Sequence, residues 1–229
     1  MIGIIGAMDS EVANLKVQMR DKQEQTIGTT VFCSGTLFGK QAVVAKSGIG
    51  KVNAALCTQN MINRYQPRLI INTGCAAGVG DGIQVGDIVL AKTAVQHDLD
   101  YGTLGDARGH IDGIDTIHIP ADETYTRKIA AIAESLGIRT RIGVVATGDQ
   151  FLCDAAKKED IKNHFGAEAV EMEGGAIAHA AYAAGVPFVI LRSVSDNGDD
   201  AAHEEFGTFV EKVNRKNMQI LKVFLEGEV

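Results

Sequence analysis

The sequence has no run of about 18 apolar residues, which a membrane-spanning helix needs, so we expect no membrane span. It also lacks an excess of basic residues: 22 lysines and arginines stand against 29 acids, and the net charge is −7. A nucleic-acid partner requires a basic surface, so none is expected. The opening stretch MIGIIGAMDSEV has neither the basic region nor the cleavage-site pattern of an export signal. We therefore expect a cytoplasmic protein.

Patterns typical of disulfides and metal sites are absent as well. The four cysteines, Cys33, Cys57, Cys75 and Cys153, are far apart in the chain and form no CxxC pair. The six histidines form no HExxH motif. We therefore predict reduced thiols, no zinc site and no other metal centre.

Apolar, strand-like runs alternate with amphipathic, helix-like segments along the whole chain. There is no linker, low-complexity tract or internal repeat, so residues 1–229 are predicted to form one domain. Such alternation predicts an α/β fold with a mostly parallel or mixed sheet. Strands are expected at 2–7, 29–48 (two strands around a turn at 38–40), 68–74, 85–98, 138–149 and 188–196. Helices are expected at 10–22, 50–65, 122–137, about 172–184 and 202–225, and a surface loop at 101–115.

Three glycine-rich stretches follow predicted strands, and none completes a nucleotide-binding motif. Residues 3–8, GIIGAM, do not match the dinucleotide fingerprint GxGxxG. Residues 47–52, SGIGKV, resemble the end of a phosphate loop, but Ala45 replaces its first glycine and Val52 replaces Ser or Thr. Each stretch alone, including 72–82 (NTGCAAGVGDG), is best interpreted as a tight turn. Together, small residues after several strands favour one shared pocket at the strand ends.

Several carboxylates lie at the ends of the predicted strands, namely Asp9, Glu11, Glu171, Glu173 and Asp196. Asp9 and Glu171 are interpreted as acids that stabilise helix N-termini. Asp196 ends the apolar run FVILRSVSD, and Arg192 precedes it by four residues, so a buried acid balanced by a cation is expected there. Composition leaves the roles of Glu11 and Glu173 open.

Seven segments taken together carry a family resemblance: IGIIGAMDSEV, SGIGKVNAA, INTGCAAG, VGDIV, TGDQF, VEMEGGAIAH and RSVSD, in this order between residues 2 and 196. In these segments the chain resembles the bacterial 5′-methylthioadenosine/S-adenosylhomocysteine nucleosidases of the purine nucleoside phosphorylase superfamily. The resemblance implies a central mixed β-sheet wrapped by helices in a three-layer α/β/α arrangement. It also implies a homodimer that acts on a small nucleoside without a cofactor.

The same resemblance implies roles for single residues. Glu11 matches the acid that activates the attacking water, and Asp196 matches the acid that protonates the purine at nitrogen seven. Glu173 matches the residue that binds the ribose hydroxyls. Such a pair of acid and base suits cleavage of an N-glycosidic bond, because the sugar gains oxocarbenium character while the base departs with negative charge.

Further positions complete the implied binding site. Phe151 matches the aromatic residue that stacks on adenine, and the Leu152 backbone reads the edge of the base. Met172 packs on the sugar. The resemblance places Met8, Ile49 and Phe206 along the pocket for the 5′ substituent, adds Ala76 and Glu171 to the substrate-binding residues (with a structural role favoured for Glu171), and makes Ser195 and Arg192 supports of Asp196.

Two departures from the family pattern and three alternatives remain. Cys75 stands where many relatives carry Ser, which puts a polar contact near the ligand in question. The loop 97–113 lacks the aromatic and proline pattern of the segment that closes over the 5′ group in relatives. The alternatives are a phosphate-dependent phosphorylase, a nucleoside-binding module without turnover, and a nucleosidase for another 5′-modified purine nucleoside such as aminofutalosine or 5′-deoxyadenosine. Two acids after the first strand, Asp9 and Glu11, favour water over phosphate as the nucleophile.

Overall fold

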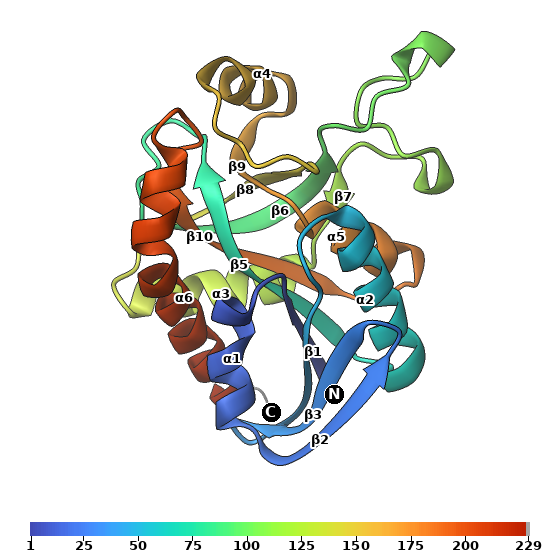
Figure 1. Ribbon diagram of the computed structural model, residues 1–229, viewed down its shortest axis with the longest axis vertical. Coiled ribbons are helices and arrows are strands. Elements are labelled where there is room, and N and C mark those ends of the chain that lie inside the picture. The colour runs from blue at the N-terminus through green and yellow to red at the C-terminus, as the bar shows by residue number, and fades with distance from the viewer. Residues whose placement is uncertain (228–229) are drawn as a thin grey trace.

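The computed structural model describes residues 1–227 and shows a mixed ten-stranded sheet with helices on both faces (Figure 1). The strands are β1 (Ile2–Gly6), β2 (Arg20–Ile27), β3 (Thr30–Leu37), β4 (Lys40–Lys46), β5 (Leu69–Gly78), β6 (Ile88–Gln96), β7 (Ile119–Pro120), β8 (Thr140–Thr147), β9 (Ala167–Glu171) and β10 (Phe188–Asp196). The α-helices are α1 (Asp9–Gln18), α2 (Lys51–Tyr65), α3 (Glu123–Ser135), α4 (Ala155–Phe165), α5 (Gly174–Ala183) and α6 (Ala202–Gly227). The predicted α/β fold is confirmed.

The strand order is β10-β6-β8-β9-β5-β1-β4-β3-β2, and β10 also pairs with β5. The pairings of β5, β10, β6, β8 and β9 therefore close into a ring, and β1, β4, β3 and β2 extend the sheet from β5. β1, β5 and β10 run parallel to one another and are buried along their whole length. This burial explains why they appear in the sequence as continuous apolar runs. Because the three strands run parallel, their carboxyl ends lie at one edge of the sheet.

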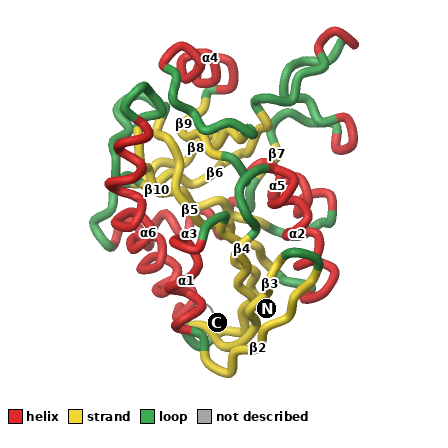
Figure 2. Tube along the Cα trace, viewed as in Figure 1, coloured by secondary structure: helices red, strands yellow, loops and turns green. Residues whose placement is uncertain are grey.

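Helices cover the sheet in two layers, as the three-layer prediction requires (Figure 2). On one face α1, α3 and α6 pack together over a core that includes Ile4, Leu15 and Phe224. On the other face α2 and α5 pack over a second core that includes Met61 and Ile190. Within residues 1–227, no helix combines the length and the apolar composition that crossing a membrane would require.

Several elements differ from the sequence-based expectation. The helix expected at 10–22 ends at Gln18, and Arg20–Ile27 forms β2 at the edge of the sheet. The side chains of β2 are almost all exposed, so its sequence has no apolar alternation to reveal a strand. α4 and β9 were not predicted. Because β9 extends to Glu171, the helix expected from about residue 172 begins at Gly174.

The segment that follows β6 projects from the body of the molecule (Figure 1). It contains two short 3₁₀ helices, η1 (Gly102–Leu104) and η2 (Asp112–Ile114), and Leu104, the last residue of η1, is 81% exposed. The predicted surface loop at 101–115 is therefore confirmed. All four cysteines are free: Cys33, Cys57 and Cys75 are buried, whereas Cys153 is exposed.

Candidate active site

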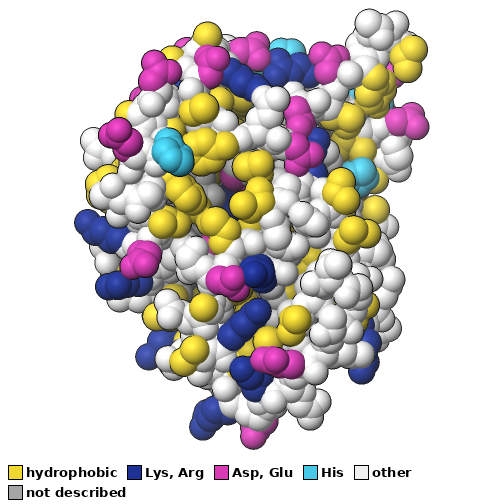
Figure 3. Space-filling view, viewed as in Figure 1, with side chains coloured by type: hydrophobic (Ala, Val, Ile, Leu, Met, Phe, Trp, Pro, Cys, Tyr) yellow, Lys and Arg dark blue, Asp and Glu magenta, His cyan; other side chains and the backbone are white. Residues whose placement is uncertain are grey.

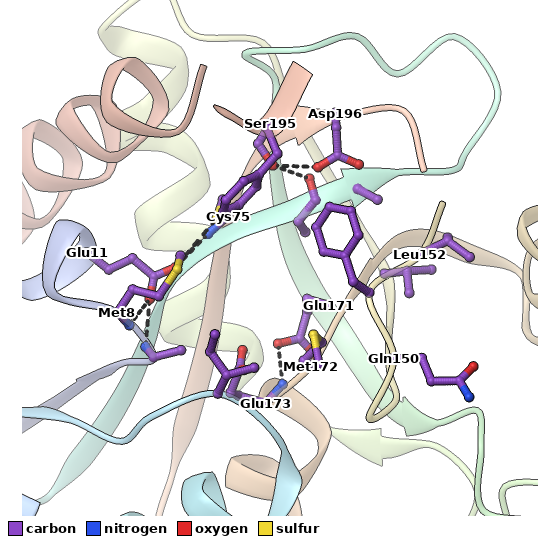
Figure 4. A pocket seen from close by; sticks show the side chains of 17 residues that line it. Met8, Glu11, Cys75, Gln150, Leu152, Glu171, Met172, Glu173, Ser195 and Asp196 are labelled. Carbon is purple, nitrogen blue, oxygen red and sulfur yellow. Dashed lines mark hydrogen bonds between the residues drawn. The ribbon is translucent and has the colours of Figure 1, made fainter. Parts of the chain in front are cut away.

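A cavity of about 180 Å³ lies where the carboxyl ends of β1, β5 and β10 meet β9 and the segment after β8. On the face shown in Figure 3, hydrophobic side chains surround a hollow. In open α/β sheets this edge is where ligands bind. The cavity is lined by Ala7, Met8, Glu11, Ile49, Cys75, Ala76, Ala77, Gln150, Phe151, Leu152, Val170, Glu171, Met172, Glu173, Ser195, Asp196 and Phe206 (Figure 4).

Glu11 lies in the first turn of α1, directly after β1, and its carboxylate is held by four donors. Oε2 accepts hydrogen bonds from the backbone N of Ala7 at 2.6 Å and of Met8 at 3.0 Å. Oε1 accepts from the backbone N of Cys75 at 3.2 Å and from its Sγ at 3.5 Å. Gly74 makes this approach possible, because a Cβ there would overlap the Glu11 and Arg192 side chains. Donors from two separate parts of the chain therefore fix the position of both Glu11 oxygens.

The Cys75 thiol is a protonated donor in this arrangement. Burial, the negative charge of Glu11 and the hydrogen bond to it raise the pKa of the Cys75 thiol well above its usual value. The thiol therefore keeps its proton at neutral pH and directs it to Glu11 Oε1. The side chain that replaces the expected serine thus retains a polar contact, and that contact is to Glu11.

Arg192 is almost fully buried behind the pocket, and its partners differ from the expected one. It donates to Asn72 Oδ1 at 2.6 Å and to Glu171 Oε2, and lies 3.6 Å from Glu173 Oε2. The expectation that Arg192 supports Asp196 was wrong. Both residues lie in β10, where four residues span roughly 13 Å, so this spacing does not bring the two charges together.

Glu171 links the buried arginine to the start of α5. Its Oε2 accepts from the backbone N of Glu173 at 2.9 Å and of Gly174 at 2.7 Å, and the Thr147 hydroxyl donates to Oε1. The interpretation of Glu171 as an acid at a helix N-terminus is confirmed by these contacts. Glu171 also lines the cavity, but its two carboxylate oxygens already accept hydrogen bonds from the protein.

Glu173 is the carboxylate between β9 and α5, and its ionisation is poised near neutrality. The backbone N of Gly50 donates to Glu173 Oε1 at 2.9 Å. Burial and the charge of Glu171 raise the pKa of Glu173 to about 7, while Arg192 and the Gly50 N–H oppose the rise. Small changes in these contacts therefore decide whether Glu173 is charged at neutral pH.

Asp196 ends β10 on a different side of the cavity from Glu11 (Figure 4). The Ser195 hydroxyl donates to its Oδ2 at 2.8 Å, and the backbone N of Gly198 donates to Oδ1 at 3.0 Å. Burial raises the pKa of Asp196, against the lowering effect of these two hydrogen bonds. The expected support by Ser195 is present. Asp196 therefore holds a proton more readily than an exposed aspartate does.

The remaining wall of the cavity is apolar. Phe151, from the segment after β8, meets Phe206 of α6 with ring centroids 5.7 Å apart and planes at 81°. Met172, Leu152 and Ile49 line the cavity with them. Such a wall suits a flat aromatic ligand. Within residues 1–227, no group of three or more His, Cys, Asp or Glu side chains is placed to hold a metal ion.

Comparison with known proteins then identifies the family. The family model of the phosphorylase superfamily matches residues 1–226. The 5′-methylthioadenosine/S-adenosylhomocysteine nucleosidase of Shewanella oneidensis is 39% identical over 226 residues, which are 98% of this chain and 96% of that protein. The chain belongs to the 5′-methylthioadenosine/S-adenosylhomocysteine nucleosidase family of the phosphorylase superfamily. It is an N-glycosidic hydrolase.

Solved structures agree with membership of the nucleosidase family. The nucleosidase of Neisseria meningitidis in complex with methylthio-immucillin-A superposes with a TM-score of 0.95 at 32% identity, covering 99% of each chain. A futalosine hydrolase of Helicobacter pylori superposes with a TM-score of 0.94 at 33% identity, covering 99% of this chain and 97% of that one. The fold is therefore shared by enzymes that are named for different substrates.

The fold brings together, around the cavity of this nucleosidase, every candidate site residue except Arg192. Sequence reasoning missed the residues outside the cavity that form hydrogen bonds with its buried charged groups. Asn72 was detectable, because a polar side chain within the apolar run RLIINTG needs a buried hydrogen-bond partner. The other missed residues are the cavity-lining Ala7, Ala77, Gln150 and Val170, and the supporting Gly50 and Thr147.

Proposed function

We propose that this nucleosidase hydrolyses the N-glycosidic bond of 5′-methylthioadenosine and S-adenosylhomocysteine, releasing adenine and the thio-ribose. The observation that carries the proposal is the contrast between two carboxylates in one cavity. Glu11 accepts hydrogen bonds on both oxygens, whereas burial raises the pKa of Asp196. One carboxylate held by hydrogen bonds on both oxygens and a second with a raised pKa suit a base and an acid in one reaction.

The two acids act at opposite ends of the bond that breaks. Asp196 donates a proton to nitrogen seven of the purine, so that adenine leaves as a neutral molecule. As the sugar gains oxocarbenium character, Glu11 takes a proton from water, and the water oxygen forms the new bond to the anomeric carbon. The Cys75 thiol and the backbone donors hold the Glu11 carboxylate in position.

The other cavity residues bind the substrate. Glu173 accepts hydrogen bonds from the ribose hydroxyls, and Met172 packs on the sugar. Phe151 stacks on adenine beside the Leu152 backbone. The wall formed by Met8, Ile49 and Phe206 receives the 5′ substituent, which suits the apolar thioether of methylthioadenosine.

A phosphorylase reaction fits this cavity poorly. Phosphate is a dianion and requires unpaired cationic donors. Arg192, the guanidinium behind the cavity, is already paired with Glu171 and lies near Glu173. The Glu11 carboxylate would in addition repel phosphate from the position of the nucleophile.

A nucleosidase for another 5′-modified purine nucleoside is the second candidate. The likeness to a futalosine hydrolase, with a TM-score of 0.94, favours keeping it, because base and ribose contacts are common to such substrates. Ile49 is 54% exposed, so the 5′ side of the cavity is the more open one. Selectivity for the 5′ group is therefore decided at that end.

We also propose that the enzyme works as a homodimer. Ile49, Val52 and Leu56 form an exposed apolar strip at the start of α2, with 54%, 70% and 58% of their surfaces accessible. Val52 and Leu56 lie four residues apart on one face of α2, Ile49 precedes the helix, and exposed apolar side chains that lie close together mark interaction surfaces. The strip adjoins the 5′ end of the cavity through Ile49.

Free-base release tests the proposed reaction. Methylthioadenosine, adenosylhomocysteine, 5′-deoxyadenosine and aminofutalosine would be compared at equal concentration, each with and without phosphate. We expect the two thio-nucleosides to react fastest and phosphate to have no effect. A phosphate requirement would identify a phosphorylase, and preferential cleavage of aminofutalosine would establish the second candidate.

A further inference from the structure

Three charged side chains outside the cavity wall join the segments that carry cavity residues. Lys51 begins α2, Asp98 follows β6 and Asp149 follows β8. Lys51 Nζ lies 2.6 Å from Asp98 Oδ1, and the Lys51 backbone N donates to Asp149 Oδ1 at 2.7 Å. The Asp149 backbone N donates to Asp98 Oδ2 at 2.8 Å. These contacts close a ring, which we call the clasp (Lys51, Asp98 and Asp149).

Asp98 is the centre of the clasp, because both of its oxygens are occupied by the other two members. Burial raises the pKa of Asp98, but the hydrogen bonds from Lys51 and from the Asp149 N–H outweigh that effect and keep the pKa below its usual value. Asp98 is therefore ionised at neutral pH. Charge-assisted hydrogen bonds on both oxygens fix its geometry more firmly than a single surface ion pair would.

The clasp connects directly to two parts of the cavity. Gly50, the residue before Lys51, is the one whose N–H donates to Glu173 Oε1 at 2.9 Å. Gly50 has a φ of +94°, and a Cβ there would lie 3.0 Å from Asp149 Oδ1, so the turn requires glycine. On the other side, Asp149 leads into Gln150 and Phe151 of the cavity wall.

We propose that Asp98 is a positioning residue of the hydrolase, which acts through the clasp to hold the Gly50 N–H against Glu173 and so to keep that carboxylate directed at the sugar. The inference rests on the sugar-binding role proposed for Glu173. Asp98 itself does not line the cavity. Its effect on the reaction therefore has to pass through Lys51, Asp149 and Gly50.

The pKa of Glu173 depends on whether the clasp is intact. Its charged neighbours are Glu171 from β9, Glu11 from α1 and Arg192 from β10, and the Gly50 N–H is its hydrogen-bond donor from the start of α2. Losing the Gly50 donor removes one contribution that lowers the pKa of Glu173, so that pKa rises from its value of about 7. A protonated Glu173 has one fewer acceptor for the ribose, so the loss of activity is greater at low pH.

The test compares Asp98→Ala, Asp98→Asn and the control Asp81→Ala by kcat and KM between pH 5.5 and 9, with the nucleoside that the wild type cleaves best. Asp81 and Lys162 form a Lys–Asp pair of the same length, 2.6 Å, away from the cavity. For Asp98→Ala we expect kcat/KM to be roughly tenfold lower near pH 6 and to be reduced less above pH 8. In a plot of kcat/KM against pH, the fall in activity on the acid side should therefore begin at a higher pH than in the wild type. Asp98→Asn, which keeps the shape and one acceptor, should show an intermediate loss.

A double-variant cycle separates this inference from the proposed function. If Asp98 acts through Glu173, adding Asp98→Ala to Glu173→Gln should cost little beyond Glu173→Gln alone. Additive losses, or a loss that is equal at every pH, would overturn the positioning role. A Glu173→Gln variant with normal kcat/KM would overturn the proposed sugar-binding role, and this inference with it. If Asp98→Ala does not fold, the same criteria apply to Asp98→Asn.

Discussion

At the scale of single residues, the site depends on how each carboxylate is surrounded. Four donors converge on Glu11, two converge on Asp196, and Glu173 lies between an arginine and another glutamate. Carboxylates that look alike in the sequence therefore have different hydrogen-bond partners, and burial raises the pKa of Glu173 and of Asp196. Hydrogen-bond donors stabilise the charged form of a carboxylate, and burial without enough donors favours the neutral one.

Replacing Glu11 with glutamine removes the group that accepts a proton from water. Because the amide keeps the size of the side chain, nucleoside binding should be largely unchanged. Turnover should fall by about 10²–10⁴-fold. Steady-state kinetics and equilibrium binding measure the two effects, with Asp9→Asn as the control, since Asp9 is exposed and pairs with Lys46. Near-native turnover of Glu11→Gln would refute the role of Glu11 as the base.

The Asp196→Asn variant tests the proton donor. Asparagine can donate a hydrogen bond to the purine but cannot transfer a proton, so adenine would have to leave as an anion. We expect turnover of adenine nucleosides to fall roughly 10²-fold or more. A nitrophenyl riboside, whose leaving group needs no proton, should lose much less. Equal losses on the two substrates would show that Asp196 only positions the ligand.

At the scale of elements, α5 packs tightly because it begins with two glycines. The Gly175 backbone N donates to the Thr147 hydroxyl at 2.6 Å, and a Cβ at Gly175 would lie 2.8 Å from that oxygen. Thr147 in turn donates to Glu171. The close contact between α5 and β8 therefore stabilises the carboxylate that holds Arg192.

Two glycine-to-alanine variants should have opposite effects on stability. Gly175→Ala forces α5 away from β8 and should destabilise the protein by about 1–3 kcal/mol. Gly207→Ala lies within α6, where a Cβ meets nothing within 4 Å, and should stabilise it by about 0.5–1 kcal/mol. Denaturant unfolding of both variants measures the difference. If Gly175→Ala left the free energy of unfolding unchanged, α5 would be able to move away from β8 without loss of stability.

The sequence predicted elements where burial leaves a pattern, and failed where it does not. β1, β5 and β10 are wholly buried, and their apolar runs predicted them. β2 has exposed polar side chains, so nothing in its sequence distinguished it from a continued helix. Cavity residues were predicted through the family resemblance. The partner of Arg192 was not predictable, since Glu171 and Asn72 reach it from distant parts of the chain.

At the scale of the whole molecule, the exposed strip on α2 predicts association. Sedimentation should give a dimer at working concentration, and Leu56→Asp should shift it toward monomer, because a charge in an apolar interface is costly to bury. Val17→Asp is the control, since Val17 is 78% exposed on α1. A wild-type protein that is monomeric and fully active would contradict the dimer.

The distribution of thiols provides a means of observing ligand binding directly. Burial raises the pKa of Cys33, of Cys57 to about 12, and of Cys75 well above its usual range, so these thiols are slow nucleophiles. Cys153 is exposed and follows Leu152 of the cavity wall. A maleimide dye should therefore label Cys153 alone in the native protein, which peptide mass mapping can verify. The fluorescence of that dye should change when adenine binds, giving a signal that requires no turnover.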